Sequence, residues 1–148
     1  MFSIKFLDLA VVLIANLINL VLSVLFLNRV HGRLDWEPAL GYGTIMMILP
    51  LTISAIFNLA NRRPWAFWVF PLVMVAYLVL EFVLDYILKL DFRHTALLGP
   101  YLLVFYLGQF ALIGYSFLVG KLHGFVTLAT YFICLGATAY SYIHVGHR

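Results

Sequence analysis

Two carboxylates inside a long apolar run are the residues whose type and spacing point most directly to chemistry. Glu81 and Asp85 lie four residues apart between Pro64 and Lys89. If this run crosses a membrane as a helix centred near Tyr77, Glu81 lies about 6 Å and Asp85 about 12 Å from the bilayer midplane. A carboxylate at the depth of Glu81 is costly unless it is protonated, paired or hydrated. Glu81 is therefore predicted to bind a proton or a cation.

Both carboxylates also have a structural interpretation. Lys89 follows Asp85 at the i+4 position, where the two side chains would form an ordinary ion pair at the interface. The carboxylate of Glu81 would instead be held by a structural hydrogen bond to one of three side chains on other segments, Asn19, Gln109 or Tyr106.

Polar residues recur at helical spacing in four apolar segments. Because a helix turns about 100° per residue, residues three, four or seven apart share a face. The predicted inward faces carry Asp8, Asn16, Asn19 and Ser23; Thr44, Ser54, Asn58 and Asn61; Gln109 and Ser116; and Thr127, Thr130, Tyr131, Cys134, Thr138 and Ser141. One interpretation is helix association through hydrogen bonds of about 0.6 to 2 kcal/mol each. The other is a polar cavity, whose predicted substrate-binding or proton-binding residues are Glu81, Asp85, Asn19, Asn16, Gln109, Thr138 and Tyr106.

Other chemistries have weaker support. Arg62 and Arg63 precede a helix start at Pro64 and are predicted to contact a lipid headgroup or a phosphate-bearing ligand. Four histidines are expected on one side of the membrane, but their spacings match no ligand motif, so no metal and no cofactor is predicted; they are His31, His94, His144 and His147. Gly-rich phosphate loops, His-Glu-x-x-His and Gly-x-Ser-x-Gly are absent from the sequence.

The elements that must position these residues are apolar segments of membrane-spanning length. Of 148 residues, 65% are hydrophobic and 10% are charged, whereas a soluble domain carries about 25% charged residues. Spanning the hydrocarbon takes roughly 20 residues, and five segments suffice: about 4–27, 39–60, 65–89, 100–119 and 125–143. The prediction is an all-α integral membrane protein, a single polytopic domain over residues 1–148 that forms a bundle of five transmembrane helices.

Two prolines inside these segments are predicted to bend their helices. Pro50 and Pro71 lack the N–H that would bond to the carbonyls of Met46 and Phe67. The segments are joined by short breaks, and the last of these is expected at residues 120–124.

Five spans put the termini on opposite sides of the membrane. We call the side of the N-terminus side A and the other side B. Side A has four Lys or Arg residues and side B has five, so the positive-inside rule does not orient the chain. The basic residues flank apolar runs and form no stripe, which predicts no nucleic-acid partner.

One stretch resembles a known family. Arg63 to Tyr77, which contains Trp-Val-Phe-Pro-Leu-Val, looks like the Trp-Val-Phe-Pro-x-Val stretch of the TspO translocator family, which is also basic and five-spanning. In that family the stretch opens the second helix, whereas here it opens the third. The likeness is confined to this stretch, so no residue role is transferred.

The expected function follows from Glu81. The leading hypothesis is a small membrane protein that binds or translocates a small or amphipathic solute through the polar cavity, as a homo-oligomer in the cell membrane. The second is an enzyme acting on a lipid or sterol-like substrate, with Glu81 and Asp85 as general acid and base. The third is an accessory subunit of a larger membrane complex. The expected partners are membrane lipid and a small-molecule or lipid ligand.

Overall fold

The computed structural model describes residues 3–90 and 95–145, and every regular element in these ranges is helical. In chain order the elements are α1 (Ile4–Val30), the short 3₁₀ turn η1 (Leu34–Trp36), α2 (Glu37–Met46), α3 (Ile48–Ala60), α4 (Ala66–Glu81), the π-helical turn η2 (Phe82–Ile87), α5 (Leu98–Val119) and α6 (Lys121–Val145).

Five helical units are long and apolar enough to cross a membrane: α1, α2 with α3, α4 with η2, α5, and α6. The predicted five-helix organisation is confirmed to this extent. Their outward faces expose many large apolar side chains, among them Leu13 at 61%, Leu49 at 68% and Phe132 at 58%. Exposed apolar surface on this scale is typical of helices that face lipid and is rare on soluble monomers.

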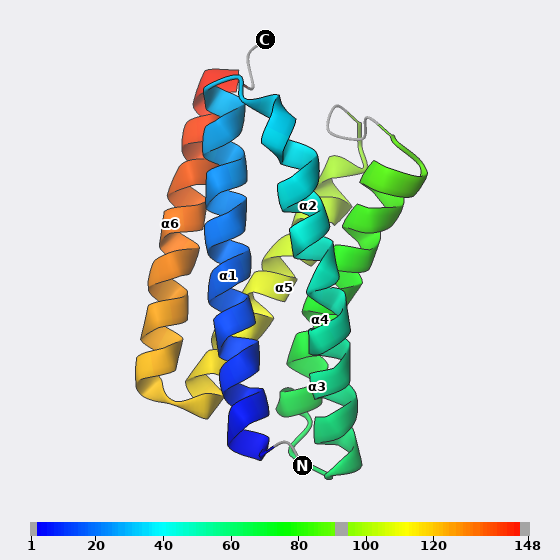
Figure 1. Ribbon diagram of the computed structural model, residues 1–148, viewed down its shortest axis with the longest axis vertical. Coiled ribbons are helices and arrows are strands. Elements are labelled where there is room, and N and C mark those ends of the chain that lie inside the picture. The colour runs from blue at the N-terminus through cyan, green and yellow to red at the C-terminus, as the bar shows by residue number, and fades with distance from the viewer. Residues whose placement is uncertain (1–2, 91–94, 146–148) are drawn as a thin grey trace.

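The helices pack in two groups that share α5. Figure 1 shows α1 and α6 side by side, with α3 and α4 forming the other side of the bundle. Helix α5 crosses diagonally behind them and contacts both α4 and α6. The buried centre is mainly apolar and includes Val11, Ile18, Leu51, Met74, Leu78, Leu112 and Tyr115. Side A lies at the lower end of Figure 1, where α1 begins, and side B at the upper end, where α6 ends.

The second span is interrupted where a bend was predicted. Helix α2 ends at Met46 and α3 begins at Ile48, so the regular helix stops at Met47. The cause is Pro50, which has no N–H to donate to the carbonyl of Met46. This break agrees with the predicted effect of Pro50, whereas α4 continues through Pro71 without interruption.

The connection before the last helix is shorter than expected. Residues 121–124 belong to α6, and Gly120 alone separates it from α5. The residues Lys121, Leu122 and His123 are all compatible with a helix, and a glycine at position 124 costs only about 1 kcal/mol. The predicted loop at residues 120–124 was therefore wrong.

Most residues of the predicted inward faces are buried, while Asn16, Thr130 and Thr138 are half-buried. Asp8, Asn19 and Ser23 in α1, Gln109 and Ser116 in α5, and Thr127, Cys134 and Ser141 in α6 are all buried. In the second span, Thr44, Ser54 and Asn58 are buried, but Asn61 is exposed. Asn61 follows the last residue of α3, so the helical periodicity no longer fixes its direction.

Candidate functional site

Glu81 lies where helix α4 changes its winding. It is the last residue of α4, and the six residues that follow form the π-helical turn η2. The side chain is half-buried, and its carboxylate interacts electrostatically with the phenols of Tyr77 and Tyr86. Short π-helical turns inside α-helices are frequent at functional sites, so this junction is the first place to look for one.

Tyr77 connects the surroundings of Glu81 to helix α5. It lies one turn before Glu81 and is 2% exposed. Its hydroxyl lies 3.0 Å from that of Tyr101 on α5, and its ring packs on Tyr101 and Phe105 at centroid distances of 5.6 Å and 5.1 Å. Tyr77 therefore connects the Glu81 carboxylate to aromatic rings and a hydroxyl group of α5.

Tyr86 connects the same surroundings to helix α2. Its ring lies 4.8 Å from that of Tyr42, and its hydroxyl reaches the backbone of Gly41 so closely that a Cβ at that glycine would lie 1.9 Å from the oxygen. Asp85 also interacts electrostatically with Tyr86. The α4–η2 junction therefore combines two carboxylates with tyrosines from α2, α4, η2 and α5.

The winding of η2 changes the expected pairing of Asp85 with Lys89. That pairing assumed a continuous α-helix from residue 85 to 89, but the segment is π-helical and ends at Ile87. Lys89 lies beyond this end with a positive φ of 49°. The i+4 geometry that would bring the two side chains together is therefore absent.

Asn16 and Asn19 are bound to helix α6. Asn16 Nδ2 donates to Thr127 Oγ1 over 3.1 Å and Asn19 Nδ2 donates to Thr130 Oγ1 over 3.0 Å. Thr130 Oγ1 in turn donates to Asn16 Oδ1 over 2.8 Å, and Thr127 Oγ1 donates to Ser116 on α5 over 3.0 Å. These bonds join α1, α5 and α6 in the way expected of polar side chains that associate membrane helices.

The remaining predicted site residues lie in different surroundings. Gln109 is 1% exposed on α5. Thr138 donates to the carbonyl of Cys134 in its own helix over 2.8 Å. Tyr106 is half-buried and packs edge-on against Phe105 at 5.1 Å. The structure thus groups Glu81 with Asp85, and Asn16 with Asn19, but in two separate clusters, because α4 packs mainly on α3 and α5 whereas α1 packs mainly on α6.

Arg63 is part of a buried polar cluster near side A. Its Nη1 and Nη2 atoms donate to Asp8 Oδ1 over 2.6 Å and Oδ2 over 3.1 Å, and Nη1 also donates to Asn58 over 2.8 Å. The Tyr115 hydroxyl donates to Asp8 Oδ1 over 2.7 Å. The guanidinium that was predicted to meet a phosphate is thus held by an internal carboxylate, while neighbouring Arg62 is exposed.

This cluster was not predicted from the sequence, although one signal pointed to it. Asp8 lies in an apolar run within two turns of the start of α1, and a carboxylate there needs a cation from the same side of the membrane. The chain direction places Arg63 on that side. Tyr115 carried no signal, because a tyrosine in an apolar helix is most often a packing residue.

Asn58 also supplies the hydrogen bond that Pro71 cannot donate within α4. Pro71 leaves the carbonyl of Phe67 without its helical donor, and Asn58 Nδ2 donates to that oxygen over 3.1 Å. The carbonyl predicted to be released is thus bonded from the neighbouring helix α3.

The expected side-B histidines form no metal centre within the described residues, where no group of three potential ligands gathers. The Nδ1 atoms of His31 and His144 lie 2.8 Å and 2.9 Å from carbonyl oxygens of their own helices. His94 and His147 fall outside the described residues.

Comparisons with known proteins identify no relative. No family model, no curated protein and no solved structure matches the chain.

Proposed function

We propose that this chain is an integral membrane protein that binds a proton or a small cation at Glu81 and thereby binds or moves a small or amphipathic solute. The observation that supports this proposal is the half-buried Glu81 carboxylate at the α4–η2 junction, with Tyr77 and Tyr86 in electrostatic contact. At the depth of Glu81 in α4, an ionised carboxylate is stabilised by a cation or by solvating hydroxyl groups.

The surrounding aromatic residues suit a site that accepts a cation. Phenol hydroxyls donate hydrogen bonds to a carboxylate and accept them from a protonated or cationic group. Aromatic faces attract cations by about 0.5 to 2 kcal/mol. Tyr77, Tyr101, Tyr86 and Tyr42 supply both features from four different elements, with ring centroids of neighbouring pairs 4.8 Å to 5.6 Å apart.

The membrane setting is part of the proposal. The five apolar units and their exposed leucine, isoleucine and phenylalanine side chains fit insertion in the cell membrane. A homo-oligomer would supply a second set of helices to enclose a solute path, since one copy of this length surrounds little space of its own.

The carboxyl chemistry can be tested directly with a hydrophobic carbodiimide, which reacts with protonated carboxyl groups. Mass spectrometry of the labelled protein is expected to find an adduct on Glu81 that decreases as pH rises. Asp35, an exposed carboxylate on η1, is the matched control and is expected to remain unmodified.

Solute movement is tested in liposomes that contain the purified protein and a pH-sensitive dye. Glu81→Gln is expected to abolish proton-coupled flux, whereas Asp35→Asn leaves it unchanged. Flux that persists in Glu81→Gln would refute the proposed role of this carboxylate.

An enzymatic function is the second candidate, because Glu81 and Asp85 both interact electrostatically with the phenol of Tyr86. Two carboxyl groups in unequal surroundings can divide the roles of general acid and base. In that case Glu81→Gln and Asp85→Asn each abolish conversion of a lipid substrate, which chromatography of extracted lipids detects. If the protein is instead an accessory subunit, these variants should lower only the yield of the assembled membrane complex.

A further inference from the structure

The end of helix α1 is a turn that fixes the position of Arg33. Gly32 has a φ of 68°, its N–H donates to the carbonyl of Arg29 over 3.2 Å, and the N–H of Arg33 donates to the carbonyl of Asn28 over 3.0 Å. These two bonds form a Schellman motif, in which glycine adopts the left-handed conformation without a Cβ clash. The backbone therefore carries Arg33 back over the last turn of α1.

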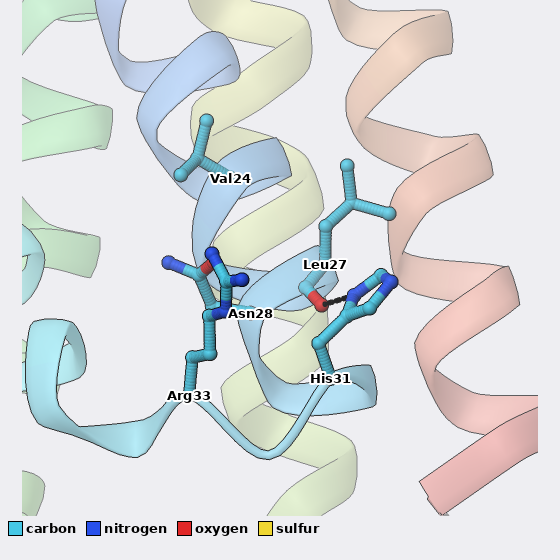
Figure 2. Close-up of a pocket in the computed structure, with 5 residues that line it drawn as sticks. All are labelled: Val24, Leu27, Asn28, His31 and Arg33. Atoms are coloured by element: carbon cyan, nitrogen blue, oxygen red, sulfur yellow. Dashed lines mark hydrogen bonds between the residues drawn. The ribbon is translucent and has the colours of Figure 1, made fainter.

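Two side chains of this turn are polar at positions that form an apolar contact in many Schellman motifs. In a Schellman motif the residue after the glycine often packs on an apolar residue five positions earlier. Here the two positions hold Arg33 and Asn28, a cation and an amide. Figure 2 shows both side chains beside the last turn of α1, with the His31 ring fixed by the contact of its Nδ1 with the Leu27 carbonyl, 2.8 Å away.

These residues line an open pocket of about 340 Å³, together with two apolar side chains. Val24 and Leu27 lie closer to the middle of α1 and are 47% and 41% exposed. The pocket is thus apolar toward the membrane centre and polar at the end of the helix, where Asn28, His31 and Arg33 lie.

We propose that this pocket binds the phosphate group of a phospholipid. The guanidinium of Arg33 matches phosphate oxygens with two parallel N–H groups, and the Asn28 amide supplies a further donor. Val24 and Leu27 offer apolar surface to the upper part of an acyl chain. This site is separate from Glu81 and requires only that α1 spans the membrane.

The negative end of the α1 dipole opposes an anion here, but its carbonyl groups are largely occupied. The oxygens of Asn28 and Arg29 accept the N–H groups of Arg33 and Gly32, and that of Leu27 accepts the N–H of His31. Arg29 is paired with Glu37 and is not counted toward the site. The unfavourable effect of the helix dipole is weaker than the hydrogen bonds that a charged phosphate group would accept from this site.

The test measures binding of three probes to the purified, delipidated protein in detergent. Short-chain phosphatidylglycerol carries both phosphate and acyl chains, short-chain diacylglycerol lacks the phosphate, and inorganic phosphate lacks the acyl chains. Phosphatidylglycerol is expected to bind most tightly. Arg33→Gln is expected to raise its Kd about tenfold, whereas Lys121→Gln, which removes an exposed cation at the start of α6 and at the opposite end of the bundle, leaves the Kd unchanged.

Three results would overturn the inference. Inorganic phosphate that binds as tightly as the lipid would identify a free-anion site, and diacylglycerol that binds as tightly would identify a purely apolar groove. A Kd that rises in Lys121→Gln and not in Arg33→Gln would move the lipid site to side A. Arg33 is exposed, so its replacement leaves the buried core intact and the comparison informative.

Discussion

Two nitrogens of the Arg63 guanidinium donate hydrogen bonds to the carboxylate of Asp8, although the two residues are 55 positions apart in the chain. Their side chains are only 16% and 12% exposed. The pair joins the start of α1 to the turn between α3 and α4, and Tyr115 extends it to α5. One ion pair therefore sets the relative positions of three spans at side A.

Removing one partner of this pair is expected to be strongly destabilising. Asp8→Asn leaves the Arg63 guanidinium buried without a counter-charge, which costs about 3 to 5 kcal/mol. Thermal or denaturant unfolding in detergent micelles measures the loss. The double variant Asp8→Asn with Arg63→Gln should lose less than the sum of the two single variants, because the unpaired charge is gone. Additive losses would show that the two side chains do not interact.

The bond from Asn58 to the Phe67 carbonyl is expected to matter only while Pro71 is present. Asn58→Leu removes the donor and costs about 1 to 3 kcal/mol. In a Pro71→Ala background the new backbone N–H can serve the same carbonyl, so the cost of Asn58→Leu should fall. Asn58 also bonds to Arg63, so part of the cost remains. If Asn58→Leu costs the same stability with and without Pro71, the bond from Asn58 does not compensate for the N–H that Pro71 lacks.

Gly41 is expected to tolerate no side chain while Tyr86 retains its hydroxyl. In Gly41→Ala the new Cβ would lie 1.9 Å from the Tyr86 oxygen and 3.2 Å from Cζ, so the ring of Tyr86 has to shift relative to Tyr42 and Glu81. We expect a lower melting temperature and loss of the carbodiimide adduct on Glu81. Adding Tyr86→Phe should restore most of the stability.

Gly43→Ala is the matched control for this variant. It lies two residues further along α2, where an added Cβ meets no atom within 4 Å. It should be neutral or slightly stabilising, since alanine favours a helix over glycine by about 1 kcal/mol. Equal effects of the two alanines would rule out the contact with Tyr86 as the cause.

The polar cluster between α1 and α6 is expected to stabilise the bundle without a part in solute binding. Thr127→Val removes the bonds to both Asn16 and Ser116, and polar bonds between membrane helices contribute about 0.6 kcal/mol each on average. The predicted loss of about 1 kcal/mol is measured by unfolding. Liposome flux should be normal in this variant, and a flux defect at normal stability would place the cluster on the solute path.

Gln109→Leu is expected to leave stability unchanged or to raise it. Within the described part of the chain, the Gln109 Nε2 atom has no hydrogen-bond acceptor, and the residue is 1% exposed. A buried donor without a partner costs about 1 to 3 kcal/mol, and an apolar residue of similar size avoids that cost. A clear loss of stability in Gln109→Leu would instead reveal that the amide serves a bound water or ligand.

The sequence was sufficient to predict the five long apolar helices, because helices that can cross a bilayer have a characteristic length and composition. The first run, expected at residues 4–27, is helical over Ile4–Val30, and the fourth, expected at 100–119, is helical over Leu98–Val119. The ends differ by two or three residues, since a helix can continue beyond its apolar core. The break near Pro50 was equally predictable, because it depends on one missing N–H.

The neighbours of each helix were not predictable, and this limited the candidate site. Helical periodicity shows which face of α1 is buried but not that α6 covers it. Asn19 was therefore a possible partner of Glu81, whereas its amide donates to Thr130. The Asp8–Arg63 pair was hidden for the same reason, because only packing brings the two residues together.

The π-helical turn was not predictable either, because Phe82 to Ile87 contains neither proline nor glycine. Such a turn fits more residues into each revolution than an α-helix does. Asp85 was expected to pair with Lys89 at the i+4 position, and that spacing brings two side chains together only while the winding remains α-helical.

The same turn also determines how the chain tolerates changes in length. A π-helical turn accommodates a surplus residue, and removing one residue from Phe82–Ile87 would let ordinary winding resume. The side chains beyond the deletion would then keep their directions around the axis, because the wider turn had already absorbed the extra residue. The same deletion in the α-helical part of α4 would rotate every later side chain by about 100°. Losing one amino acid other than Tyr86 from Phe82–Ile87 would therefore leave Tyr86 facing the backbone of α2, whereas losing one from the preceding α-helical turns would separate α2 from the end of the third span.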